Sequence, residues 1–275
     1  MLAGGIQPAR GFSPALWIKS EALSLTPVLA LAVTLFAPMA FADDARQIVE
    51  EAQRRAHASS ERYEGTLTVF NRTGKIAEKR WRYERIGSHG NSKSIIRFSS
   101  PAEVKGVALL IVNHPERSSD QWMWTPALER NRRIAMQDRR RRFFGTDFSF
   151  EDLEERDAGQ YDFRMLGEET LEGQPCWKIE SRPKETKTSQ YGRSVIWIRK
   201  DHYVWWRLEN YSQEKLVRRA RYGDLENVSG IWTARTVEMT DVREGSRTVL
   251  RLEKLDYNAP MKDEQFTLQA LRREL

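Results

Sequence analysis

Arginine and phenylalanine side chains are concentrated in one short stretch of the chain, residues 137–156. Four consecutive arginines are followed within a few residues by four phenylalanines: Arg139, Arg140, Arg141 and Arg142, then Phe143, Phe144, Phe148 and Phe150. Guanidinium groups bind phosphate or carboxylate in bidentate pairs, and phenyl rings bury against apolar groups. The stretch therefore predicts either an anion clamp at the mouth of an apolar pocket or a charged sheet edge that blocks pairing with other chains.

The rest of the sequence offers little that would support catalysis or metal binding. Its histidines stand far apart, in none of the spacings of a helical metal site: His57, His89, His114 and His202. It has no G-x-S-x-G elbow, no glycine-rich phosphate loop and no C-x-x-C pair, and Cys176 is its one cysteine. We therefore expect no enzyme, no cofactor and no metal site, and we expect Cys176 to be a small buried residue without a disulfide.

The N-terminal segment has the layout of a secretory signal peptide. Arg10 and Lys19 precede an apolar run at residues 23–37, and Ala40 and Ala42 occupy the small positions of a cleavage site. A membrane anchor is the alternative, but the run has about 15 residues where a spanning helix needs roughly 20. We expect cleavage of residues 1–42, export, and a mature single domain over residues 43–275.

The chain is basic, and the full sequence has a formal net charge of +6. Nucleic acid is the usual partner of a basic chain. An exported protein meets anionic lipid and envelope polymers instead, so we expect an anionic membrane surface and no nucleic acid among its partners.

Hydrophobic periodicity predicts one helix followed by many strands. Residues 44–59 carry apolar positions at helical spacing, and from Tyr63 onward the pattern has period two. Trp81 and Tyr83 share one strand face, and turn signals such as "NRTGK" and "LEGQ" separate the strands. The pattern predicts an antiparallel sheet or barrel in one domain.

Some of the predicted strands are apolar on both faces, as in "VIWI" at residues 195–198 and "YVWW" at residues 203–206. A sheet with one wet face would alternate more cleanly. These strands favour a sheet that is curved around something and covered on its other side. An ordinary packed core remains the alternative, because small barrels fill themselves with side chains.

A short helix is predicted inside the arginine–phenylalanine stretch. With Ser149 as the N-cap, Asp152 is the N3 residue, and Phe148 can pack onto Leu153 as a hydrophobic staple. Gly145 breaks the chain just before it. A short helix that interrupts a run of strands must pack on the sheet or cover its opening.

Four motifs give the chain a resemblance to a known family. They are "SPAEVKGVALL" at residues 100–110, "FFGTDFSFEDL" at 143–153, "GIWTARTVEMTD" at 230–241 and "DEQFTL" at 263–268. With these motifs the chain resembles the LolA-like family of periplasmic outer-membrane lipoprotein-sorting proteins. The resemblance implies a mainly β fold, a half-open antiparallel β-barrel of the LolA/LolB type, with an N-terminal helix and short lid helices over an apolar cavity.

The resemblance and the pattern together predict a periplasmic carrier without enzymatic activity. Its cargo would be lipid or the acyl chains of lipoproteins, moved toward the outer membrane, with an inner-membrane transporter or envelope protein as a further partner. The alternative is a sensor or adaptor of the same fold that binds an envelope regulatory or transport protein. We expect the cavity wall to contain Trp81, Tyr83, Trp122, Trp124, Phe143, Phe144, Trp197 and Trp205. We expect Phe148 and Phe150 in the lid, and Arg139, Arg140, Arg141 and Arg142 against anionic head groups or a membrane.

Overall fold

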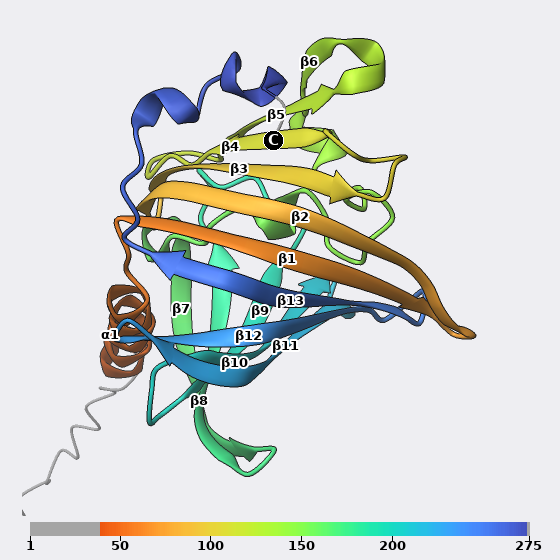
Figure 1. Ribbon diagram of the computed structural model, residues 1–275. Helices are drawn as coiled ribbons and strands as arrows, with labels where there is room; N and C mark the ends of the chain where they lie inside the picture. Colours follow the sequence, from red (N-terminus) through yellow and green to blue (C-terminus); the bar gives the residue numbers. More distant parts are fainter. Residues whose placement is uncertain (1–38, 274–275) are drawn as a thin grey trace, which may run out of the picture. The chain divides into compact units, whose positions relative to one another are not determined.

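One antiparallel sheet makes up most of the structure, a computed structural model that describes residues 39–273 (Figure 1). Its first six strands are β1 (Ser60–Asn71), β2 (Gly74–Ser88), β3 (Asn91–Ser100), β4 (Ala108–Val112), β5 (Asp120–Thr125) and β6 (Arg130–Arg133). The next seven are β7 (Tyr161–Leu171), β8 (Gln174–Pro183), β9 (Arg193–Arg199), β10 (Trp205–Ser212), β11 (Lys215–Val228), β12 (Ile231–Asp241) and β13 (Ser246–Tyr257).

The order of the strands in space makes the sheet a half-open barrel. They lie in the order β6-β5-β4-β3-β2-β1-β13-β12-β11-β10-β9-β8-β7, so β1 pairs with β13 at the centre. Within the described residues the edge strands β6 and β7 do not pair with each other, and the curved sheet stays open between them. The prediction of a mainly β, half-open antiparallel barrel is therefore confirmed.

One α-helix, α1 (Met39–Arg55), precedes the sheet and packs against β7. Its buried residues Ala45, Val49 and Ala52 recur at helical spacing, as the sequence predicts. The helix ends at Arg55 rather than at residue 59, because the chain turns there into β1 and the Ser59 backbone N–H donates to the Asn258 side chain at 2.9 Å. Residues 39–273 also contain six 3₁₀ turns: η1 (Pro126–Leu128), η2 (Met136–Asp138), η3 (Glu151–Leu153), η4 (Ala158–Gln160), η5 (Asp263–Gln265) and η6 (Ala270–Arg272).

The predicted signal peptide falls mostly outside the described residues. Its apolar run precedes residue 39, and the predicted cleavage point after Ala42 lies at the beginning of α1. Cleavage therefore stays a prediction. Over residues 39–273, no helix combines the length and the apolar character that a membrane crossing demands.

Apolar side chains form one cluster inside the curve of the sheet and two on its outer surface. Because side chains alternate along a strand, Ile196 and Ile198 of β9 belong to the inner cluster, while Val195 and Trp197 belong to an outer one. The prediction from "VIWI" that such strands are covered on both faces is confirmed. Cys176 is buried in the same outer cluster and is a free cysteine.

The second outer cluster is covered by the C-terminal segment, which lies over β4 and β5 (Figure 1). Phe266, Ala270 and Leu271 are buried there together with Leu110 of β4. The Arg97 guanidinium fixes the segment, since it donates to the backbone carbonyls of Leu271 at 2.8 Å and Ala270 at 3.1 Å. The last turns thus give the outer face of β3–β5 the cover that its apolar residues require.

A close approach inside the sheet depends on one glycine. Gly65 of β1 pairs with Trp81 of β2, and a Cβ atom at residue 65 would lie 2.3 Å from the indole Nε1 atom of Trp81. Only the absence of a side chain lets the ring of Trp81, which is 3% exposed, lie across β1.

Candidate ligand-binding site

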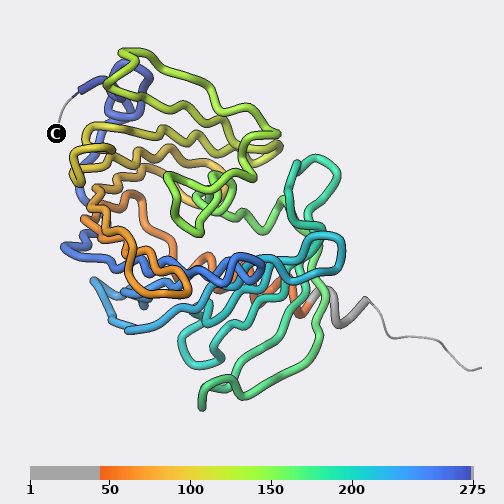
Figure 2. The backbone as a smooth tube through the Cα atoms, turned by 90° about the vertical axis from the view of Figure 1, so that its right-hand side faces the viewer, coloured from red at the N-terminus to blue at the C-terminus, as the bar shows by residue number. Residues whose placement is uncertain are grey.

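The arginine–phenylalanine stretch lies inside the curve of the sheet, and we call residues 137–156 the inner segment. Its trace, green in Figure 2, runs between the two arms of the sheet. The Phe143 ring is 5.3 Å from that of Phe98 on β3, 6.3 Å from that of Trp81 on β2 and 5.4 Å from that of Phe150, centroid to centroid. The segment therefore fills the part of the barrel under β1–β4 with its own aromatic side chains.

A buried carboxylate ties the inner segment to the centre of the sheet. Asp147 is fully buried, and its side chain accepts hydrogen bonds from the hydroxyls of Ser246 and Thr248 on β13. Its backbone N–H donates to the Thr248 hydroxyl at 2.8 Å, and the Arg142 guanidinium forms an ion pair with the same carboxylate. The sequence "GTD" is thus a fixed crossing over β13.

The predicted short helix is present as the single 3₁₀ turn η3. Ser149 and Asp152 make the reciprocal contacts of a capping box: the Ser149 backbone N–H donates to the Asp152 carboxylate at 2.7 Å, and the Asp152 N–H donates to the Ser149 hydroxyl at 3.3 Å. The turn goes no further because Glu154 takes an extended conformation, with φ −74° and ψ 142°. That conformation directs Glu154 into a polar network.

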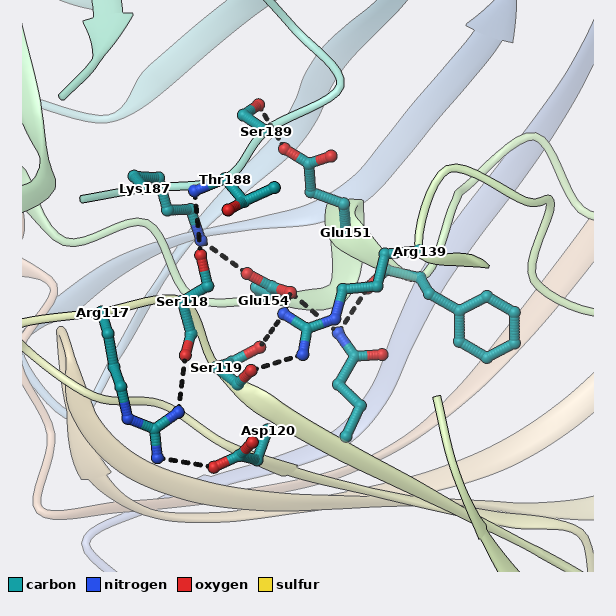
Figure 3. A network of polar contacts seen from close by, with 12 residues as sticks. Arg117, Ser118, Ser119, Asp120, Arg139, Glu151, Glu154, Lys187, Thr188 and Ser189 are labelled. Atoms are coloured by element: carbon teal, nitrogen blue, oxygen red, sulfur yellow. Dashed lines mark hydrogen bonds and ion pairs between the residues drawn. The ribbon is translucent and has the colours of Figure 1, made fainter. Parts of the chain in front are cut away.

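This network surrounds Glu154 with two buried cations (Figure 3). Its carboxylate lies 2.9 Å from a guanidinium nitrogen of Arg139 and 2.6 Å from the Lys187 ammonium, and the three side chains are 4–5% exposed. Gln121 of β5 donates to the same carboxylate at 3.0 Å. Burial lowers the pKa of Lys187, but the charge and hydrogen bond of Glu154, together with Tyr161 and Glu151, raise that pKa above its ordinary value. The network joins β5, the inner segment and the β8–β9 connection.

The four arginines therefore divide into two pairs. Arg139 is buried against Glu154, and Arg142 bonds to Asp147 and the Thr146 carbonyl, so both guanidinium groups already have partners within the fold. Arg140 and Arg141 are exposed. A clamp that uses all four side chains does not form, because consecutive residues of this irregular segment point in different directions. Arg141 is 70% exposed and pairs with Asp138 at 3.0 Å, and among the described residues Arg140 has no ion pair. These two side chains can therefore contact a head group without breaking a buried ion pair.

A cavity of about 800 Å³ lies on the other side of the inner segment. This volume is in the range of about 300–1,000 Å³ that is usual for small-molecule sites. Its walls come from the last turn of α1, the end of the inner segment, the turn before β10, and the strands β10, β11 and β12. The strands supply an apolar wall that contains Leu208, Ala220, Ile231, Val237 and Met239.

Aromatic side chains form the rim and the polar side of this cavity. The His202 and Trp232 rings stack at 3.9 Å, and the Arg55 guanidinium lies 4.0 Å from the Tyr203 ring centroid. These contacts join α1, the turn before β10 and the start of β12. Tyr222 also lines the cavity, and burial raises its pKa to about 12, against the opposing charge of Arg156. Its phenol is therefore a neutral hydrogen-bond donor at physiological pH.

The aromatic residues singled out from the sequence lie in three different places. Phe148 and Trp205 line the cavity. Five others belong to or pack against the inner cluster, on the filled side of the barrel: Trp81, Tyr83, Phe143, Phe144 and Phe150. Three more belong to or pack against the outer clusters and do not line the cavity: Trp122, Trp124 and Trp197. Trp122 and Trp124 are covered by the C-terminal segment, and Trp197 packs among outward-facing side chains of β7–β10.

Several cavity residues were not singled out from the sequence. Val237 and Met239 of β12 stand two apart, in the alternating pattern that places both on one face. That pattern was available in "TVEMTD", although nothing local shows that this face lines a cavity. Arg156, which closes the acidic run "EDLEER", also lines the cavity and was missed. Among the described residues, no group of three or more His, Cys, Asp or Glu side chains could hold a metal ion.

This chain matches one family model and is similar to several solved structures. A family model described as "uncharacterized protein" matches residues 90–273. A domain from Vibrio parahaemolyticus that is named as an outer membrane lipoprotein-sorting protein domain is 25% identical, with a TM-score of 0.79 over 84% of this chain and 100% of that one. A DUF1329 family protein from Desulfovibrio piger is 27% identical, with a TM-score of 0.80 over 84% of this chain and 99% of that one.

A more distant structure shares the fold. A LolA superfamily protein from Nitrosomonas europaea is 20% identical, with a TM-score of 0.65 over 81% of this chain and 97% of that one. The search of curated proteins found no match. The half-open barrel with one N-terminal helix is thus the fold that these solved structures share with this chain.

Proposed function

Because this chain belongs to the LolA-like family of lipoprotein-sorting proteins, we propose that it is a periplasmic carrier of lipid or of lipoprotein acyl chains. It would be exported by a cleaved signal peptide and would move its cargo toward the outer membrane. The cavity of about 800 Å³ beside the inner segment carries the proposal, since its wall on β10–β12 is apolar. Carriage makes and breaks no covalent bond, in keeping with a sequence that has no catalytic motif.

The physical demand on such a carrier is binding that is strong yet reversible. Each buried CH₂ group contributes about 0.8 kcal/mol, so a long chain that was buried completely would not be released. The inner segment already fills the part of the barrel under β1–β4, which limits the depth of the remaining cavity. The rim contacts His202–Trp232 and Arg55–Tyr203 join separate elements, and their separation would open the cavity.

Filling the cavity should weaken ligand binding. Val237 lies on the apolar wall and is partly buried, so Val237→Trp would place an indole where the ligand sits. We expect at least a tenfold rise in the dissociation constant for a fluorescent fatty acid, measured by titration; tenfold corresponds to about 1.4 kcal/mol.

The matched control for this variant is Val242→Trp. Val242 follows the last residue of β12, is 40% exposed and does not line the cavity. This change should leave the affinity unaltered, while circular dichroism checks that both variants are folded. Equal uptake by the parent protein and the Val237→Trp variant would place the ligand elsewhere and contradict the proposed site.

Delivery to a membrane would use the exposed arginines Arg140 and Arg141. A cationic residue near an anionic bilayer contributes about 1 kcal/mol, so Arg140→Ser/Arg141→Ser should weaken cosedimentation with anionic vesicles by at least fivefold at low salt. Arg72→Ser/Arg243→Ser removes the same charge from two other exposed positions and is the control. If both double variants lose binding equally, net charge and not this surface governs the contact.

A further inference from the structure

Almost all of the charged side chains that line the cavity have an ion-pair partner or short hydrogen bonds within the fold. Arg54 and Arg55 form ion pairs with Glu51 at 2.7 Å, and Lys187 pairs with Glu154 at 2.6 Å. The lining carboxylates are satisfied as well. Glu151 accepts from the Ser189 hydroxyl and the Gln190 N–H, Asp152 from the Tyr191 hydroxyl, and Glu155 from the Ser92 hydroxyl, while Glu155 also lies 3.5 Å from Arg85.

Arg156 is the exception in this lining. Among the residues that the structure describes, no carboxylate lies within 4.0 Å of its guanidinium group. Its hydrogen-bond partners are the hydroxyls of Ser181 and Ser194, at 3.4–3.5 Å, which is long for such a bond. The Ser194 hydroxyl itself donates to Asn210 at 2.7 Å. This partly buried guanidinium group thus has no anion beside it within the described residues.

Aromatic rings hold this guanidinium group in place. It lies 4.6 Å from the ring centroid of Tyr161 and 5.9 Å from that of Trp205, and all three residues line the cavity. The backbone carbonyl of Arg156 accepts a hydrogen bond from the Gln53 side chain of α1 at 2.5 Å. The rings contact the faces of the guanidinium plane, and the N–H groups at its edge make only the long contacts to Ser181 and Ser194. These N–H groups can exchange those contacts for a bidentate pair with an oxyanion.

The wall on β10–β12 makes the other side of the cavity apolar. Leu208, Ala220, Val237 and Met239 offer apolar contact and no charge. An elongated ligand could therefore lie along these strands with its polar end at Arg156. Neutral ligands would leave the guanidinium group without an anion, and a short anion would leave the apolar wall empty.

We propose that Arg156 is an anion-recognition residue of the cavity, and that the ligand is an acyl amphiphile with a carboxylate or phosphate head. This inference rests on the proposed carrier function and narrows its cargo to anionic amphiphiles. The buried arginines that hold the fold together make short contacts within it: Arg139 with Glu154 at 2.9 Å, Arg85 with Glu61 at 3.1 Å, and Arg97 with a backbone carbonyl at 2.8 Å. The Arg156 side chain is instead positioned for a partner that arrives with the ligand.

The test compares three probes of equal chain length: a fluorescent fatty acid, its methyl ester and the corresponding acyl monophosphate. The parent protein should bind at least one of the two anionic probes about tenfold or more tighter than the ester. Arg156→Gln should lose that preference and leave ester binding unchanged. Arg54→Gln, which changes an arginine that also lines the cavity but pairs with Glu51, should keep the preference.

The outcomes distinguish a phosphate head group from a carboxylate head group, and they test the role of Arg156 separately from the carrier function. Tighter binding of the phosphate probe would assign the site to a phospholipid-like head, and tighter binding of the acid would assign it to a fatty acid. Equal binding of acid, phosphate and ester by the parent protein would overturn the role of Arg156 and leave the carrier function standing. Failure of every probe to bind, with Val237→Trp indistinguishable from the parent protein, would overturn both.

Discussion

Replacing Phe143 with alanine should lower the free energy of unfolding by about 3–5 kcal/mol. Phe143 is 1% exposed, and four rings surround it at centroid distances of 5.1–6.3 Å: Trp81, Phe98, Phe144 and Phe150. The truncation leaves a void between the inner segment and β2–β3 that rigid strands cannot close. Urea unfolding followed by far-UV circular dichroism would measure the loss.

The control for this prediction is Phe70→Ala. Phe70 lies near the end of β1, is only partly buried and has the Arg247 guanidinium 4.1 Å from its ring centroid. We expect this change to cost on the order of 1 kcal/mol. If Phe143→Ala cost no more than Phe70→Ala, the inner segment would not be packed as a core element, and the filled side of the barrel would be open to ligand.

The strand content of the fold could be predicted because the signals are local. Alternation in β2 places Trp81 and Tyr83 on one face, and Asn71 and Gly74 close the first hairpin through hydrogen bonds to the Asn71 side chain. Neither signal depends on distant residues. The pairing of β1 with β13, which closes the centre of the sheet, joins segments about as far apart as the domain allows. No local pattern contains that pairing; the half-open barrel was expected from family motifs.

Which face of a strand points inward could not be predicted from alternation. Trp81 and Tyr83 on β2 and Trp122 and Trp124 on β5 show the same period of two. The first pair faces the inner segment, and the second packs in the outer cluster beneath η5 and η6. The cover for the second pair comes from the C-terminal segment, far away in the sequence. An aromatic pair on one face therefore predicts burial, without telling which layer buries it.

The partners of the four consecutive arginines also could not be predicted from the local sequence. The sequence sets four cations beside an acidic stretch, residues 151–155, and this proximity could have indicated internal pairing. Arg139 pairs with Glu154 and Arg142 with Asp147, while Arg140 and Arg141 remain exposed. The expected clamp treated the four side chains as one surface, which would require a regular strand or helix. In an irregular segment, each side chain finds its own partner.

The second large effect should follow from Glu154→Gln. This change would leave Arg139 and Lys187 buried with no carboxylate within the network, and removing one partner of a buried ion pair costs about 3–5 kcal/mol. The pKa of Lys187 is raised in the fold, so its contribution to stability is complete at pH 7 and is lost only as pH rises through that raised pKa. Urea unfolding at pH 7 therefore reports the full effect.

Two further variants show whether the unpaired cations cause the loss. Glu154→Leu/Lys187→Met/Arg139→Met removes all three charges, and replacing a buried ion triad by apolar residues is often close to neutral. We expect the triple variant to recover most of the stability that Glu154→Gln loses. Glu226→Gln, which breaks an exposed pair with Arg235, should cost less than about 1 kcal/mol. If Glu154→Gln matched Glu226→Gln, water would reach the two cations, and the inner segment would be held by its aromatic side chains and Asp147 alone.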